Sequence, residues 1–353
     1  MNAFVVGYYA LLIGASCLAA YLGKRQAFLL IFSLTLASFI MGIIGGEQAL
    51  WTVTVIAGII GLAAGVAYSF REFLALILPR EGARVMRTAP LTASFGLFVI
   101  FTYAIAGIFA PVIAPYGEAE VISQSFAPAD EKMLLGADQI GRDMFSRIIY
   151  GARNTVGLAL VATALAFLLG AVAGLLAATK GGRLDQFLGR VADVVMSVPS
   201  LIFALLLLSI FGTNVAVLVV IIAIIYSPRV FRLTRAVAGD VVVMDYIEAA
   251  RLRGERLWYL IRKEILPNCK APLIAEFGLE FCFVFLLVAG LSFLGLGIQP
   301  PTADWGSMVR ENATLITFGE ITPLIPAAAI ALLTVAVNFV VDWMLFRSSG
   351  LKE

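Results

Sequence analysis

Long apolar stretches separated by short polar segments dominate the pattern along this chain. A helix needs about 20 apolar residues to cross a bilayer, because the hydrocarbon core has no water to satisfy free backbone groups. The sequence therefore predicts an all-α polytopic membrane protein with about nine transmembrane helices. The predicted spans are residues 3–22, 27–44, 49–70, 91–113, 155–178, 194–211, 215–230, 272–296 and 322–346.

A polar linker, residues 71–90, separates the first three predicted spans from the last six. It is rich in arginine and turn residues, which is typical of a boundary between modules. We therefore interpret residues 1–80 as accessory N-terminal transmembrane helices and residues 81–353 as the core domain. The first span has neither a basic start nor an obvious cleavage site, so we expect a helix there rather than a signal peptide.

The composition agrees with this picture and narrows the chemistry. Hydrophobic residues make up 61% of the 353 positions and charged residues 14%, and the net charge of +2 offers no bulk attraction for nucleic acid. Histidine is absent, and Cys17, Cys269 and Cys282 stand at unrelated spacings. These facts argue against a metal site and a histidine-activated nucleophile. No GxxxxGK[ST] phosphate loop occurs, so we expect this chain not to hydrolyse ATP itself.

The placement of lysine and arginine predicts the orientation, because short cytoplasmic loops retain these cations. With the N-terminus outside and the C-terminus in the cytoplasm, most of the 25 cations fall on the cytoplasmic side. The cations left outside are Lys132, Arg142, Arg147, Arg153 and Arg310. The opposite orientation would invert that distribution.

The longest predicted cytoplasmic loop, residues 240–270, carries an unusual mixture of charged and small residues. The stretch DYIEAARLR favours a short helix, Gly254 permits a turn, and a second helical stretch is expected to end at Pro267. Ala249 and Ala250 present almost no side chain, which suits close docking into a groove on a soluble protein. The alternative is a solvated helical hairpin without a partner, and the pattern alone leaves both interpretations open.

Three motifs then point to a family. Glu248, Ala249, Ala250 and Gly254, followed by Leu266-Pro267, resemble the EAA loop of bacterial ABC importer permeases. The segments LGADQIGRDMFSRIIYGAR (135–153) and LSFLGLGIQPP (291–301), the latter followed by DWG (304–306), resemble those of the C-subunit permeases of dipeptide and oligopeptide importers. The motifs occur in family order, so the chain is similar to permease subunits of peptide/nickel-type importers.

This resemblance implies a six-helix permease core preceded here by three extra N-terminal helices. It implies a bacterial inner-membrane location and four partner chains besides the bilayer: a second permease, two ATPase subunits and an external solute-binding protein. ATP and Mg would bind the ATPase subunits, and no cofactor would bind this chain. Val288 stands where many relatives have glutamate, so no substrate contact is carried over. The residues implied to couple to the ATPases are Glu248, Ala249, Ala250, Arg251, Gly254, Leu266 and Pro267.

A charged segment before the fifth predicted span forms a second candidate site. Its charges are spaced so that several pairs fall on neighbouring helical turns, which predicts an amphipathic elbow at the outer membrane interface. One interpretation is an element near the gate and the binding-protein dock; the other is a salt-bridged helix that anchors the following span. The candidate residues are Asp138, Gly141, Arg142, Asp143 and Arg147.

Glu276 and Glu280 share one helix face near the inner end of the eighth predicted span. A carboxylate that faces lipid is costly, so both are expected to face protein or water. They could line the inner pathway and contact a substrate amine, or pair with Arg229 or Arg232.

For the whole chain, the alternatives to the importer are an ATP-independent secondary transporter and a membrane assembly protein. A secondary transporter should carry charges at the membrane midplane, whereas here they cluster at span ends.

Overall fold

The computed structural model describes residues 58–348, together with residues 12, 14, 15, 31, 33, 35 and 55. The predicted spans 3–22 and 27–44 and the beginning of 49–70 lie outside the described residues, apart from those isolated positions. The chain divides into two compact units, Met1–Leu91 and Thr92–Glu353. In the first unit, an apolar helix covers Gly58–Ile77 and a short helix, α3, covers Arg80–Arg87.

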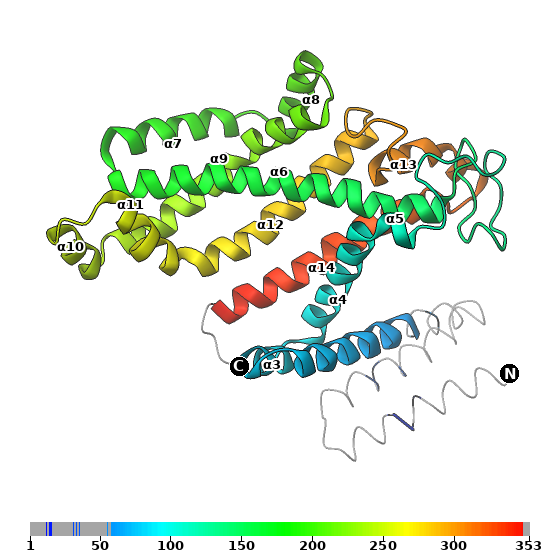
Figure 1. The fold of residues 1–353 in the computed structure, drawn as a ribbon, viewed down its shortest axis with the longest axis horizontal. Helices are drawn as coiled ribbons and strands as arrows, with labels where there is room; N and C mark the ends of the chain where they lie inside the picture. Colours follow the sequence, from blue (N-terminus) through cyan, green and yellow to red (C-terminus); the bar gives the residue numbers. More distant parts are fainter. Residues whose placement is uncertain are drawn as a thin grey trace. The chain divides into compact units, whose positions relative to one another are not determined.

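The second unit is built from helices joined mostly by short turns (Figure 1). Residues 114–143 are the longest non-helical segment of its described part. Its helices are α4 (Leu91–Ile108), α5 (Ala110–Ile113), α6 (Met144–Lys180), α7 (Gly182–Met196), α8 (Ser200–Phe211), α9 (Val215–Val242), α10 (Asp245–Leu252), α11 (Leu257–Tyr259), the π-helical η1 (Leu260–Ile265), α12 (Leu266–Phe293), α13 (Trp305–Asn312), the 3-10 helical η2 (Ala313–Phe318) and α14 (Leu324–Ser348).

Within the described part, six helices are long and apolar enough to cross a membrane, or up to seven if one bent pair counts as a span. The predicted all-α polytopic fold is therefore confirmed, while the count of nine spans stays a prediction. The bent pair corrects the predicted span 194–211, because α7 and α8 meet at 87°. Pro199 precedes α8, and a helix of 12 residues is only about 18 Å long, too short to cross the core alone.

A second correction concerns Pro267, which was expected to end a helix. The helix instead continues from Leu257 to Phe293. The π-helical turn η1 ends two residues before Pro267, so the backbone hydrogen-bond pattern is already shifted where proline lacks an N–H. Pro267 therefore lies in the first turn of α12, where a missing backbone N–H is tolerated.

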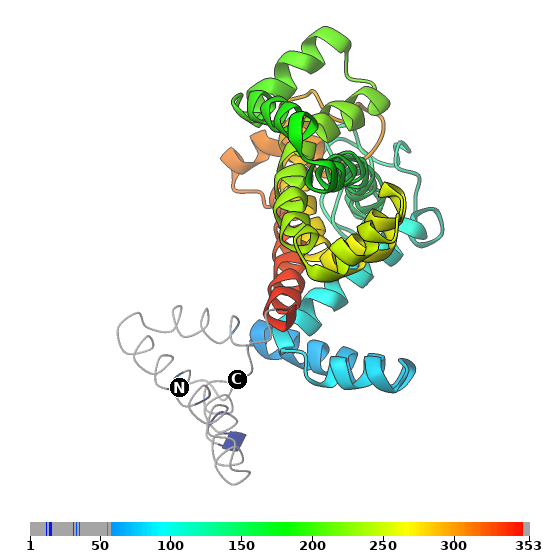
Figure 2. The ribbon, with the colours of Figure 1, turned by 90° about the vertical axis from the view of Figure 1, so that its left-hand side faces the viewer.

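Close helix contacts organise the core of the second unit. Gly170 and Gly174 of α6 face α9 so closely that an added Cβ would overlap the backbone near Ser227 and Phe231. Such small residues let helix backbones approach in a membrane. Buried apolar side chains of α6, α8, α9, α12, α13 and α14 form one continuous cluster. The segment α10–α11 lies at one end of α6, the end that faces the viewer in Figure 2, and α13 lies near the other end (Figure 1).

Candidate functional site

The short helix α10 has one buried face and one exposed face. Ile247 and Ala250 are fully buried and pack in a cluster with Ile261 and other residues of η1, α9 and α12. Glu248 and Ala249, on the opposite side, are exposed. The helix is thus held against the bundle by its apolar side, while its small and acidic residues face outward.

The end of α10 has a defined cap. Gly254 has φ of +82°, its N–H donates to the carbonyl of Arg251 at 2.9 Å, and the N–H of Glu255 donates to the carbonyl of Ala250 at 3.2 Å. This pair of bonds is a Schellman motif, which requires a left-handed residue that glycine adopts without cost. The predicted short helix and the turn at Gly254 are therefore confirmed.

A polar contact links α10 to the end of a long helix. Arg251 Nη2 donates to the carbonyl of Thr179, one residue before the end of α6, at 3.3 Å. Since Ala238 of α9 and Ile265 before α12 belong to the buried cluster beneath α10, this helix rests against three long helices, α6, α9 and α12.

The loop around α10 also exposes large apolar side chains. Val243, Leu252 and Trp258 are 79%, 84% and 65% exposed. Leu266 and Pro267, predicted to lie at the end of the loop, are exposed at the start of α12. Exposed apolar groups gathered in one segment are typical of a surface that another protein or the membrane interface covers.

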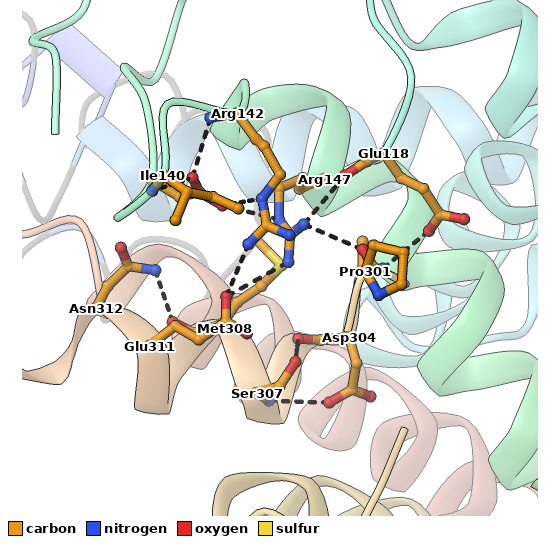
Figure 3. Close-up of polar contacts among 12 residues, drawn as sticks. Glu118, Ile140, Arg142, Arg147, Pro301, Asp304, Ser307, Met308, Glu311 and Asn312 are labelled. Carbon is orange, nitrogen blue, oxygen red and sulfur yellow. Dashed lines mark hydrogen bonds and ion pairs between the residues drawn. The ribbon is translucent and has the colours of Figure 1, made fainter. Parts of the chain in front are cut away.

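The charged segment around the start of α6 is buried in the protein, which corrects the predicted amphipathic elbow. Asp138, Arg142, Asp143 and Arg147 are all at most 2% exposed. Arg142 Nε donates to Asp138 Oδ2 at 2.6 Å, and its Nη2 donates to Glu311 Oε2 of α13 at 3.0 Å (Figure 3). The charges sit inside the protein because each has a partner there.

Arg147, on the first turn of α6, completes this cluster. Its Nε lies 3.4 Å from Asp138 Oδ2, its Nη2 lies 3.5 Å from Glu311 Oε2, and its Nη1 donates to the carbonyl of Glu118 at 3.0 Å. Two guanidinium groups and two carboxylates, Asp138 and Glu311, thus balance in charge. We call these four residues, Asp138, Arg142, Arg147 and Glu311, the ion cluster.

Gly141 and Asp143 shape the backbone around the ion cluster. Gly141 has φ of +85°, and an added Cβ would overlap the carbonyl of Ser123. Asp143 is the N-cap of α6, with its carboxylate accepting from the N–H of Ser146 at 2.8 Å. This cap starts α6 before the predicted residue 155, so that Arg147 belongs to the helix itself.

Segments 135–153 and 304–306, which carry two of the family motifs, meet beside this cluster. Gly151 of α6 contacts the ring of Trp305, whose Nε1 donates to the carbonyl of Ile148 at 3.0 Å. Gly306 in turn packs against the carbonyl of Ala289 on α12. Burial raises the pKa of the Asp304 carboxyl, although hydrogen bonds from groups such as the Ser307 N–H oppose that rise.

Several residues of this region carried no signal in the sequence. Glu311 contacts Arg142 across 169 positions, so no local spacing could reveal the pair. Glu118 accepts from Asn154 Nδ2 at 2.9 Å and from the N–H of Ala303 at 2.8 Å. Both acids lie in segments that, on pattern alone, are ordinary polar connections.

The two glutamates of α12 differ in their surroundings. Glu276 is half-buried, whereas Glu280 is 1% exposed and its Oε1 has no hydrogen-bond partner among residues 58–348. The predicted alternative of pairing with Arg232 is wrong, because Arg232 pairs with Asp193 at 3.3 Å. Arg229 lies 5.3 Å from the centre of the Tyr226 ring, without an ion pair in the described part of the chain.

Long apolar helices, a capped loop helix at one end and a buried ion cluster at the other define the class of protein: a multi-pass α-helical membrane protein. Residues 166–348 match the family "Binding-protein-dependent transport system inner membrane component". The chain belongs to this family and is a permease subunit of an ABC importer of the inner membrane. This membership decides against the secondary transporter and the assembly protein considered from the sequence.

Several relatives align over most of their length. The chain is 34% identical to the di/tripeptide transport system permease protein DppC of Pseudomonas aeruginosa over 254 residues, which covers 70% of this chain and 84% of the relative. It is 31% identical to the probable D,D-dipeptide transport system permease protein DdpC of Escherichia coli, covering 73% and 87%. It is 32% identical to the glutathione transport system permease protein GsiD of Pectobacterium atrosepticum, covering 74% and 88%.

Proposed function

We propose that this permease moves peptides or a related small solute into the cytoplasm, as one half of a heterodimer with a second permease. Its relatives are named for di- and tripeptides, D,D-dipeptides and glutathione, all of which are short, peptide-like molecules. The external solute-binding protein would select the solute, so a peptide library offered to that protein would identify it. The chain itself would be non-catalytic, with ATP and Mg held by two ATPase subunits.

The observation that carries the proposed coupling is the division of α10 into two faces. Its exposed face, with Glu248 and Ala249, would seat in a groove of an ATPase subunit, while Ile247 and Ala250 remain fixed to the bundle. ATP-driven closure of the ATPases would then move α10 and shift the bundle between inward- and outward-open states. The ATPases can shift this equilibrium only through contacts that differ between the two states.

Orientation follows from the same proposal. The α10 end of the second unit would face the cytoplasm, and the ion cluster near α13 would face outward. The N-terminus would lie outside and the C-terminus in the cytoplasm, in line with the distribution of lysine and arginine. Residues 1–80 would form an accessory module, and the half-buried Glu276 would line the inner part of the pathway, with the buried Glu280 one turn behind it.

An experiment on Ala249 tests the coupling. Ala249→Trp would overfill the close contact with the ATPase, and overpacking costs about 1–3 kcal/mol. We expect the variant to insert normally but to lose ATPase subunits on purification, and solute-stimulated ATP hydrolysis and uptake to fall together. Ala249→Ser, which keeps a small side chain, is the control. Uptake at the wild-type rate by the tryptophan variant would show that α10 is only a solvated helix.

A further inference from the structure

An apolar groove with a volume of about 550 Å³ lies along the side of α6 and α12, outside both the ion cluster and the exposed face of α10. Its α6 wall uses positions three and four apart on one helix face, and two of them, Leu168 and Val172, are 62% and 44% exposed. The groove therefore opens sideways, toward the surroundings of the helices. The residues of the α6 wall are Phe167, Leu168, Ala171, Val172 and Leu175.

The α12 wall of the groove runs from Leu266 to Phe277. At 1.5 Å per residue this distance along the helix is about 17 Å, close to half of the roughly 30 Å thickness of the hydrocarbon core. The groove is thus as long as one leaflet of a bilayer is deep. A single acyl chain from one leaflet has this length and the same apolar character.

One lining residue, Lys270, is charged. It is exposed and has no ion pair with an acidic side chain in the described part of the chain. Side chains on a helix point toward its N-terminus, so the Lys270 stem runs toward Leu266 and the α10 end. Long lysine side chains in this position reach the membrane interface with their ammonium group.

Lys270, the charged residue among those that line the groove, is a cation. Residues 262–270 contain the cations Arg262, Lys263 and Lys270 and one acid, Glu264. Basic pockets between transmembrane helices attract the phosphate groups of anionic lipids. A helix of a second permease would instead have to bring a carboxylate to neutralise Lys270.

We propose that this groove binds an anionic phospholipid from the leaflet on the α10 side, with an acyl chain between α6 and α12 and its phosphate at Lys270. Leu175 and Leu273 line the groove and also belong to the buried cluster that contains Ile247 and Ala250. The lipid thus contacts the buried cluster against which α10 packs, on the side that faces the groove. Its presence therefore supports the position of the loop helix, beyond the coupling role proposed above.

Lipid binding to the complete purified transporter tests this inference without solute or ATP. Native mass spectrometry would compare phosphatidylglycerol with phosphatidylcholine of the same acyl chains. We expect Lys270→Gln to weaken phosphatidylglycerol binding about fivefold and to leave phosphatidylcholine binding unchanged, since one interfacial cation contributes mainly to anionic lipids. Arg190→Gln, an exposed cation on α7 away from the groove, should change neither.

A second variant separates the groove from the charge. Ala171→Phe fills the apolar wall and should lower the binding of both lipids. A photo-crosslinking amino acid at Leu168 should form a product with lipid in the assembled transporter. Wild-type phosphatidylglycerol affinity in Lys270→Gln, or a crosslink from position 168 to another protein chain, would overturn the proposal. Either outcome would leave the ATPase-coupling proposal untouched, because that proposal is tested at Ala249.

Discussion

Arg142 and Arg147 pair with one acid nearby in the sequence, Asp138, and with one far away, Glu311. The spacing predicted pairs on neighbouring turns of an amphipathic elbow; Asp138 and Arg142 do pair, but in a buried segment before the helix begins. Burial within the protein depends on Glu311, which arrives from α13. The spacing of Gly170 and Gly174 is similarly weak evidence for a helix contact, because a chain with 32 glycines contains such spacings by chance. Only the structure shows that both glycines pack against α9.

Removing one arginine from the ion cluster should be strongly destabilising. Arg142→Met leaves Asp138 and Glu311 with only Arg147, and an uncompensated buried charge costs about 3–5 kcal/mol. We expect a clear drop in the unfolding temperature of the purified protein. The double variant Arg142→Met with Glu311→Met restores the charge balance and should recover part of the loss. Arg183→Met, at an exposed cation of α7, should have little effect.

At the scale of elements, the sequence correctly predicted those elements whose conformation depends on their own residues. The helix α10 and its glycine turn follow directly from the stretch DYIEAARLRG. The predicted helix end at Pro267 was wrong because the π-helical turn η1 shifts the hydrogen-bond pattern just before the proline, so its missing N–H does not interrupt the helix. Such a turn has no recognisable pattern in the sequence. The bend between α7 and α8 was missed because hydropathy records apolar length but not direction.

The turn at Gly254 should tolerate only residues that accept a positive φ. Gly254→Val places a β-branched residue at φ of +82°, with an expected cost on the order of 1–2 kcal/mol. We expect the variant to insert but to show reduced solute-stimulated ATP hydrolysis and uptake. Gly254→Asn is the matched control, because asparagine enters this region more readily. If valine and asparagine variants transport equally well, the conformation of this turn does not matter for coupling.

For the whole molecule, hydropathy predicted the fold class, and three motifs predicted the family. The structure adds that segments 135–153 and 304–306, far apart in the chain, meet at one end of α6, while α10 lies at the other. This arrangement could not be derived from the spacing of the motifs. It depends on the packing of α6 against α12 and α13, which involves contacts between distant positions.

The proposed orientation predicts which positions a membrane-impermeant thiol reagent reaches in intact cells. Ala129→Cys, exposed in the segment before α6, should be labelled from outside. Arg183→Cys, exposed at the start of α7, should be labelled only after the membrane is permeabilised. Labelling of position 183 alone in intact cells would reverse the orientation. A cysteine-free background, with Cys17, Cys269 and Cys282 replaced by serine, provides the blank.

The two ends of α6 have different attachments, the ion cluster at one end and the contact with α10 at the other. The ion cluster fastens the first turn of this 37-residue helix to α13, while Thr179, beside Arg251, lies at the opposite end, close to the point where Gly174 packs against α9. A helix of this length measures about 55 Å, so a tilt of only about 5° moves its far end by about 5 Å, close to one helical turn. A small tilt of α6 in the proposed transport cycle would therefore displace the region beneath α10 more than the region beside the ion cluster.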